Sequence, residues 1–521
     1  MSLANRISDE VLGAVERGTA IPFWAQRQPE VPAIVSEHGA RTFAQLNARA
    51  NQLARALRRR GLARGDAVAL MCTNRPEFAE VWAACHVAGL RLTPLNFHLT
   101  GGEAGYIVND CEAKAFIADA SLADAARGAL STTSPVPVRL VVGGDIDGFD
   151  SYEAALSAEP DGNLDDPMLG GVMLYTSGTT GQPKGVHRPL PPPVQPLVLS
   201  YYGYRDGDVH LCTGPLYHAA PLGISMTVPL TCGVGVVLMD KWSAEPTLEL
   251  VERHRVTHTH MVPTMFHRLL ALPDAVRGRY DLSSLRFILH GAAPCPVHVK
   301  QQMIEWLGPI VNEYYAATEG LGTTVDSHVW LTKPGTVGKP TPSAQVIVGD
   351  ENAQLVPPRT VGFVWLLAPS VGRFEYFKDE RKTAKSYRGN YFTLGDMGYL
   401  DEDGYLFLTD RSANLIISGG VNIYPAEVDA VLLDHPAVGD AATIGVPNDE
   451  WGEEVKAVVE LKPEVSPSPA LADELIDFCR ARLAHFKCPR SVDFIDKLPR
   501  LDSGKIYKRL LRERYREAAR R

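Results

Sequence analysis

The sequence predicts an α/β fold. We expect a large N-terminal domain of packed mixed and parallel sheets with helices, extended by a β-rich subdomain, and a small α+β C-terminal domain. Helical and strand patterns alternate through the first half, the pattern becomes strand-rich from Pro340, and a separate βαβ-like module begins near Ser412. The 521 residues exceed the usual size of one domain.

The alternation of helix and strand is clearest near the N-terminus. Thr42–Leu62 carries apolar residues at helical spacing, Asp66–Met71 is typical of a short strand, and Pro76–Ala88 is typical of a helix with proline in its first turn. Successive strand, helix and strand imply a parallel sheet covered by helices. Further buried strands are predicted at Gly171–Tyr175, Val234–Met239, His258–Val262 and Arg286–Leu289.

Turn-forming residues divide the strand-rich stretch Pro340–Asp410, and the remaining C-terminal residues are enough for a small domain. The boundary is predicted at Asp410–Asn414. This gives an N-terminal domain over residues 1–410, a link over residues 411–414 and a C-terminal domain over residues 415–521.

The composition excludes several classes of protein. Lys and Arg total 52 and Asp and Glu total 61, a formal charge of −9, which argues against sequence-independent nucleic-acid binding. The eight cysteines have no zinc-ligand spacing and are interpreted as reduced core thiols. The N-terminus lacks the pattern of a signal peptide, and no apolar run reaches bilayer length. We therefore expect a cytoplasmic protein, and the oligomeric state is left open, with a homodimer as one option.

A loop of small and hydroxylated residues follows the strand predicted at 171–175. In Tyr175–Val186 (YTSGTTGQPKGV), small residues let backbone N–H groups approach phosphate oxygens, and a lysine adds positive charge. The spacing is not that of the GxxxxGK[ST] loop, because Gly185 follows the lysine. Such a run alone is more often only a flexible loop. The candidate phosphate-binding residues are Thr176, Ser177, Gly178, Thr179, Thr180, Gly181 and Lys184.

Six further segments follow this loop. They are Pro215–Ala220 (PLYHAA), His290–Pro294 (HGAAP), Tyr314–Gly320 (YYAATEG), Tyr391–Asp403 (YFTLGDMGYLDED), Ser418–Glu427 (SGGVNIYPAE) and Pro499–Ile506 (PRLDSGKI). Each alone has an ordinary explanation, such as a tight turn or a surface charge. Together and in this order, over nearly the whole chain, they resemble the adenylate-forming superfamily of acyl-CoA synthetases, firefly-type luciferases and peptide-synthetase adenylation domains.

The resemblance implies a fatty-acid or aryl-acid CoA ligase, which uses ATP and Mg²⁺ to form an acyl-AMP, releases pyrophosphate and transfers the acyl group to coenzyme A. An amine or a carrier-protein thiol is the alternative acceptor. A phosphate-loop ATPase or kinase would release ADP instead. The intact Lys184, Glu319, Asp396 and Lys505 argue against a nucleotide-binding protein without catalysis.

The resemblance also implies roles around the nucleotide. The turn formed by Gly291, Ala292 and Ala293 is expected to line the adenine and the acyl pocket. By the same match, Tyr315 stacks on adenine, Thr318 approaches the phosphate, Glu319 holds Mg²⁺, Asp396 binds the ribose and Arg411 contacts the ribose or a phosphate. Ala316 stands where glycine is usual in the family.

Further roles implied by the resemblance concern the chemistry and the second domain. Lys505 is expected to be the catalytic lysine, and His218 to border the acyl and thiol paths. Gly419 and Gly420 are expected to line the thiol channel on a C-terminal domain that is mobile about the 411–414 hinge. Ala413 lacks the charge that the family commonly has at this hinge position.

Two local patterns could suggest other functions. His258 and His260 share one face of a predicted strand and could form a metal pair, but a core strand bordering the acyl pocket is favoured, because no further ligand lies nearby. The basic C-terminal tail from Lys505 could contact an anionic membrane, but a solvated face is favoured.

Overall fold

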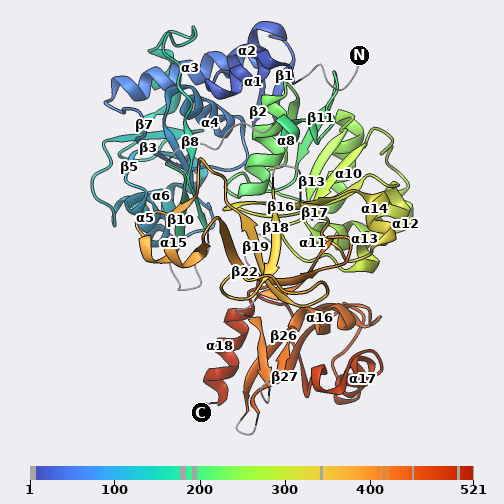
Figure 1. Cartoon of the computed structure of the whole chain (residues 1–521). Coiled ribbons are helices and arrows are strands. Elements are labelled where there is room, and N and C mark those ends of the chain that lie inside the picture. The colour runs from blue at the N-terminus through green and yellow to red at the C-terminus, as the bar shows by residue number, and fades with distance from the viewer. Residues whose placement is uncertain are drawn as a thin grey trace.

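The computed structural model describes residues 7–176, 183–189, 196–340, 344–411, 414–418, 421–448, 451–500 and 505–519. Figure 1 shows a large body that holds most of the chain and a smaller C-terminal part below it, which carries β26, β27 and α16 to α18. Within the described residues, no helix is long and apolar enough to cross a membrane.

The first sheet is parallel throughout and has strand order β7-β6-β5-β3-β4-β8. Its strands are β7 (Asp150–Ser151), β6 (Val138–Val142), β5 (Ala113–Asp119), β3 (Ala67–Met71), β4 (Arg91–Pro94) and β8 (Gly171–Val172). Helices alternate with these strands along the chain: α3 (Phe43–Arg59), α4 (Pro76–Ala88), α5 (Gly101–Asp110), α6 (Ala123–Leu130) and α7 (Tyr152–Ser157). The predicted parallel architecture is thereby confirmed for this half.

The second sheet has strand order β17-β16-β15-β14-β13-β11-β12-β1-β2. It is parallel from β15 to β1 and antiparallel at both ends. Its strands are β1 (Pro32–Ser36), β2 (Gly39–Thr42), β11 (Val209–Cys212), β12 (Gly235–Leu238), β13 (His258–Met261), β14 (Phe287–His290), β15 (Val311–Ala317), β16 (Gly320–Val325) and β17 (Lys339–Pro340). The predicted strands in this region are confirmed with small shifts at their ends.

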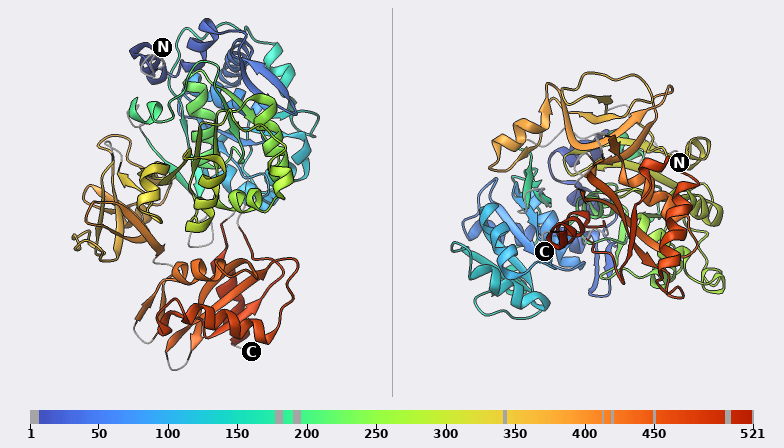
Figure 2. Two further views of the ribbon diagram at one scale, coloured as in Figure 1. Left: turned by 90° about the vertical axis from the view of Figure 1, so that its right-hand side faces the viewer. Right: turned by 90° about the horizontal axis from the view of Figure 1, so that it is seen from below.

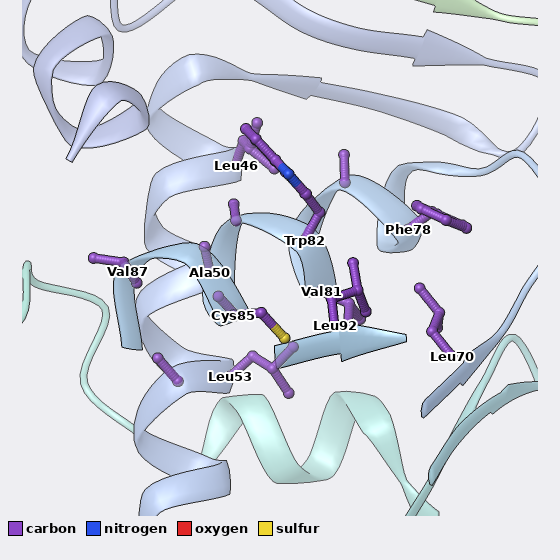
Figure 3. Packing of buried hydrophobic residues seen from close by; sticks show 14 of the residues in the cluster. Leu46, Ala50, Leu53, Leu70, Phe78, Val81, Trp82, Cys85, Val87 and Leu92 are labelled. Carbon is purple, nitrogen blue, oxygen red and sulfur yellow. The ribbon is translucent and has the colours of Figure 1, made fainter. Parts of the chain in front are cut away.

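The core lies between these two sheets. One apolar cluster joins α3 and α4 to Leu70 of β3, Ile34 of β1 and Val236 of β12, and Figure 3 shows side chains of both helices packed together above β4. Helix α3 begins at Phe43 because Thr42 and Gln45 form a capping box. Helix α4 is buried on nearly all sides, in keeping with its mostly apolar sequence.

One predicted strand is corrected by the structure. The stretch predicted as a single strand over Gly171–Tyr175 is divided between β8 and β9 (Leu174–Thr176), which belong to different sheets. The backbone N–H of Met173 still donates to Leu92, but from Leu174 the chain pairs antiparallel with β10 (Lys184–His187). A continuous apolar run cannot reveal such a change of partner, because both strands bury side chains.

The strand-rich region forms a separate small sheet. It contains β18 (Val346–Gly349), β19 (Gly362–Leu367), β21 (Tyr387–Arg388), β22 (Tyr391–Leu400) and β23 (Leu406–Arg411). A short strand, β20 (Glu375–Tyr376), leaves this region to pair with β10, and α15 (Glu380–Ser386) follows it. The hairpin of β9 and β10 is thus attached to the β-rich subdomain.

The C-terminal module combines a sheet with three helices. Its strands are β24 (Ile416–Ser418), β25 (Val421–Ile423), β26 (Val438–Asn448), β27 (Gly452–Leu461) and β28 (Ser491–Phe494), and its helices are α16 (Pro425–Leu433), α17 (Pro469–Arg480) and α18 (Lys508–Ala519). Strands β27 and β28 are parallel and joined through α17, as the βαβ-like pattern predicted. Residues 412 and 413 lie outside the described residues, and the domain boundary stays a prediction.

Candidate active site

A cavity of about 2050 Å³ opens between the large body, the β-rich subdomain and the C-terminal segment. Its wall includes six of the predicted catalytic and binding residues. They are Thr176, His218, Ala292, Thr318, Glu319 and Lys505. These residues come from widely separated parts of the chain, and their convergence on one space makes the cavity the candidate active site.

The two ends of the glycine-rich loop are held by the β9–β10 hairpin. Thr176 and Lys184 are paired across the hairpin, and the Lys184 ammonium lies 3.3 Å from a carboxylate oxygen of Asp379, just before α15. Lys184 is therefore held at the edge of the cavity by the β-rich subdomain. Ser177, Gly178, Thr179, Thr180 and Gly181 lie outside the described residues, as do Gly419 and Gly420.

Tyr315 and Asp396 meet at the contact between the nine-stranded sheet and the β-rich subdomain. The Tyr315 hydroxyl donates to Asp396 Oδ2 at 2.7 Å, and both side chains are buried. Asp396 is also opposite Arg411 in the β22–β23 pairing, although the side chain of Arg411 is not described. The three predicted nucleotide-binding positions are thus brought together from β15, β22 and β23.

Not every predicted residue belongs to the cavity wall. Among the described residues, the wall does not include Lys184, Gly291, Ala293, Tyr315 or Asp396. Close in sequence to Tyr315 and Asp396, the wall includes Tyr314, Ala316 and Leu394. Ala316, which stands where glycine is usual in the resembling family, is one of the wall residues.

Glu319 is held by partners that the sequence does not reveal. Its Oε1 accepts a hydrogen bond of 2.8 Å from the Tyr376 hydroxyl, and its side chain is buried. The Arg188 guanidinium donates to the backbone carbonyls of Thr318 and Glu319 at 3.3 and 2.6 Å. Burial lowers the pKa of Arg188, whereas Glu319 raises it. Arg188 and Tyr376 therefore fix the turn that presents Thr318 and Glu319.

The turn after β14 has the backbone shape of a binding loop. Ala292 lines the cavity with φ +67°, a left-handed conformation that is uncommon without glycine. A Cβ atom on Gly291 would lie 2.6 Å from the Tyr314 backbone oxygen, so only glycine fits there. The sequence HGAAP is thereby explained as a tight turn pressed against β15.

Lys505 and His218 approach the cavity from its two domains. Lys505 lines the cavity together with Arg500 and Tyr507 of the C-terminal module. His218 precedes the π-helix η3 (Pro221–Thr227), and its ring contacts the Tyr217 ring at 4.5 Å between centroids. The structure thus places the predicted catalytic lysine and the predicted gating histidine on the wall of the same cavity.

An aromatic and apolar surface forms another part of the wall. It is built by Tyr201, Tyr202, Ile224, Val228, Leu289 and Tyr314. His260 borders this surface, and its Nε2 lies 3.1 Å from the Tyr314 hydroxyl. Burial lowers the pKa of His260 to about 4, so this histidine is neutral near pH 7.

The two histidines of β13 have structural partners. His258 Nε2 lies 2.8 Å from the Tyr202 carbonyl oxygen, and the side chain is buried. His260 borders the cavity, as the favoured interpretation of a core strand predicted. Within the described parts of the chain, no group of three or more His, Cys, Asp or Glu side chains could hold a metal ion.

Comparisons with known proteins cover most of this chain. The family described as AMP-binding enzyme matches residues 22–374, and the family described as AMP-binding enzyme C-terminal domain matches residues 427–505. A feruloyl-CoA synthase from Amycolatopsis sp is 35% identical over 497 residues, which cover 94% of this chain and 97% of that protein. A fatty acid–[acyl-carrier-protein] ligase from Streptomyces coeruleorubidus is 33% identical over 507 residues, 95% of each chain.

A solved structure shows the same fold. An anthranilate CoA ligase in complex with anthranoyl-AMP superposes with a TM-score of 0.84 and 26% sequence identity, covering 97% of this chain and 98% of that chain. The crystallised complex contains the kind of acyl-adenylate that the sequence motifs predict for this chain.

Proposed function

The chain belongs to the AMP-binding enzyme family, and on this premise we propose that it joins a carboxylic acid to the thiol of coenzyme A through an acyl-AMP. The observation that carries the proposal is the convergence of Thr318, Glu319, His218 and Lys505 on one cavity. The sequence places these residues in three widely separated segments. A shared active site explains why the fold brings them together.

In the first step, the acid attacks the α-phosphorus of ATP. The carboxylate oxygen forms a bond to phosphorus, the bond between phosphorus and the bridging oxygen breaks, and pyrophosphate leaves with the electron pair. Lys505 donates to the carboxylate and to the α-phosphate, where negative charge must be stabilised. Thr318 donates to a phosphate oxygen, and the 176–184 loop surrounds the outer phosphates.

The nucleoside half of ATP has a separate set of partners. Asp396 accepts hydrogen bonds from the ribose hydroxyls, and Tyr315 stacks on adenine while its hydroxyl holds the Asp396 carboxylate. The adenine ring lies against the turn at 291–293, where small residues leave room for a flat ring. Arg411, next to Asp396 in the sheet, contacts the ribose or a phosphate.

Glu319 fits a magnesium ion that arrives with ATP. Its carboxylate lies on the cavity wall, and Mg²⁺ combines one or two protein carboxylates with phosphate oxygens and water. The Tyr376 hydroxyl orients the carboxylate for this purpose. When bound, the ion neutralises phosphate charge and so favours the release of pyrophosphate.

In the second step, the thiol of coenzyme A attacks the carbonyl carbon of the acyl-AMP and its proton passes to water. The bond from this carbon to the phosphate oxygen breaks, and AMP leaves with the electron pair. His218 borders the path of the thiol. The C-terminal domain rotates about residues 411–414, withdraws Lys505 and presents Gly419 and Gly420 along the thiol channel. The cytoplasm, where ATP and reduced coenzyme A are both available, is the proposed location.

The acid has an apolar body of fatty or aryl type. Tyr201, Ile224 and Leu289 surround the space beyond the phosphate site with aromatic and aliphatic surface. His260 is neutral and adds no positive charge for a second carboxylate. The name of the feruloyl-CoA synthase, an aryl-acid ligase, supports the aryl alternative. A carrier-protein thiol is the second candidate acceptor, because the relative from Streptomyces coeruleorubidus carries that acceptor in its name.

The test is a panel of fatty and aryl acids, scored for acid-dependent pyrophosphate release without acceptor and then with coenzyme A, a carrier protein or an amine. We expect release with at least one apolar acid and a thioester only with coenzyme A. If the thioester forms on the carrier protein alone, the carrier protein and not coenzyme A is the acceptor. If no acid in the panel causes pyrophosphate release, the proposed function is refuted.

A further inference from the structure

One of the lysines on the wall of the cavity, Lys382, lies beside Glu319. Lys382 belongs to α15, and its backbone N–H donates to Asp379 Oδ1 at 3.0 Å, the bond that starts this helix. The helix follows directly after β20, which pairs with β10. Lys382 is therefore carried by the same small unit that holds the ends of the 176–184 loop.

The Lys382 ammonium is held by a ring face. Its Nζ lies 3.8 Å from the centroid of the Tyr376 ring, and the hydroxyl of the same ring donates to Glu319 Oε1 at 2.8 Å. An ammonium has three N–H donors, and a ring face attracts the charge without satisfying them all as hydrogen bonds. Tyr376 thus positions the cation and the Glu319 carboxylate at once.

The charges around Lys382 suit a ligand with several negative charges. Burial lowers the pKa of Lys382, Glu319 and Asp379 raise it, and the nearby Lys184 lowers it. Asp379 joins the two lysines, because it caps the helix of Lys382 and lies 3.3 Å from Lys184 Nζ. Lys184 and Lys382, which come from distant segments, thus share one charged cluster with Asp379 and Glu319, and a polyphosphate that binds there would meet both lysines.

We propose that Lys382 is a further phosphate-binding lysine beside Lys184 and Lys505, which donates to the outer phosphates of ATP and then to the departing pyrophosphate. The inference rests on the proposed function and adds to it a residue outside the segments that the sequence marked. The electron pair of the broken bond stays on pyrophosphate, so a cation at this place stabilises the charge that develops in the first step.

The test compares the same substitution at two lysines. Lys382→Met keeps the length of the side chain and removes its charge. Lys378→Met is the matched control, since Lys378 is exposed, pairs with Glu112 at 3.0 Å and is not among the described residues of the cavity wall. Lys382→Arg restores the charge. Thermal unfolding of each variant checks the fold.

For Lys382→Met we expect the KM for ATP and the inhibition constant of inorganic pyrophosphate to rise roughly tenfold or more, the usual effect of losing one charge-assisted hydrogen bond. The KM for the acid and the rate of thioester formation from supplied acyl-AMP should stay within about twofold. Lys382→Arg should recover most of the loss, and Lys378→Met should behave as the wild type.

Two results would overturn the assignment. Unchanged ATP and pyrophosphate constants in Lys382→Met, with an active wild type, would remove Lys382 from phosphate binding and leave the proposed function intact. Equal losses for ATP, acid and acyl-AMP would reduce Lys382 to a structural role. A wild type without any acid-dependent pyrophosphate release would instead refute the function on which the inference rests.

Discussion

Among single residues, Lys505 gives the sharpest test of the adenylation step, because it is the predicted catalytic lysine and lines the cavity from the C-terminal module. In Lys505→Ala, acid-dependent ATP–pyrophosphate exchange should fall by roughly 10²–10³, as for other losses of one transition-state donor. Thioester formation from supplied acyl-AMP should be affected much less. The exposed Lys462 provides a control. Undiminished exchange in Lys505→Ala would remove this lysine from the chemical step.

Asp396 and Tyr315 bear on nucleotide affinity. Asp396→Ala removes the proposed ribose partner and leaves the buried Tyr315 hydroxyl without its 2.7 Å acceptor. The Kd for ATP should rise roughly tenfold or more, because a charged hydrogen-bond partner is lost. Calorimetric titration measures the Kd for ATP. Tyr315→Phe should raise this Kd less, because it keeps the ring and removes only the hydroxyl. An unaltered ATP affinity in Asp396→Ala would mean that the ribose is bound elsewhere.

The sequence indicated some of these residues and could not indicate others. Glu319, Asp396 and Lys505 lie in motifs whose order along the chain carries the resemblance. Arg188 and Tyr376 stabilise Glu319 equally directly, but their partners lie 131 and 57 residues away. No local pattern encodes contacts of that range, and an arginine after a short strand looks like a surface residue.

At the scale of elements, α13 (Val297–Leu307) and β15 share a buried ion pair. Lys300 Nζ lies 2.7 Å from Glu313 Oε2, and the lysine side chain is fully buried. Lys300→Met should destabilise the fold by about 3–5 kcal/mol, because it leaves a carboxylate buried without its partner. Lys300→Met with Glu313→Leu should recover part of the loss. Urea unfolding of both variants measures this, and a double variant worse than the single one would contradict the explanation.

Strands β11, β13 and β14 carry buried histidines whose charge the sheet cannot accommodate. Burial lowers the pKa of His258 and of His260 to about 4, and the pKa of His210 and His290 is also lowered by burial. The unfolded chain binds these protons near pH 6.5 and the folded chain does not, so stability is complete above that pH and is lost as pH falls toward 4.

His258 and His260 each contribute on the order of 3 kcal/mol to this loss by pH 4. Urea midpoints measured from pH 7.5 down to pH 4.5 should therefore decrease, and His260→Gln should weaken the dependence. A midpoint that stays constant over this range would show that these side chains are protonated in the folded sheet.

Some boundaries of helices and strands could be predicted from the sequence pattern, and others could not. Helix α3 was predictable because its apolar spacing and its capping residues agree. The division of residues 171–176 between β8 and β9 was not predictable from the sequence. The change of partner depends on β10, which follows the loop and pairs with β9. Parallel and antiparallel buried strands have the same apolar signature.

At the scale of the molecule, the C-terminal part stands below the large body in Figure 1 and in the left view of Figure 2. Residues of both parts line the cavity. The side chain of His298 on α13 lies 2.8 Å from Asp434 at the end of α16, a contact between the two parts. The predicted fold class and the family are confirmed. The domain boundary and the rotation about it stay predictions, because they concern a second arrangement of the same chain.

The central claim is that the residues around this cavity act on one ATP molecule at its innermost phosphorus. A single-turnover reaction with ATP and an accepted acid, quenched before coenzyme A is added, tests it most directly. The account predicts one pyrophosphate and one enzyme-bound acyl-AMP for each acid consumed, and AMP and the thioester once coenzyme A is supplied. Formation of ADP and phosphate, or release of pyrophosphate without the acid, would contradict it.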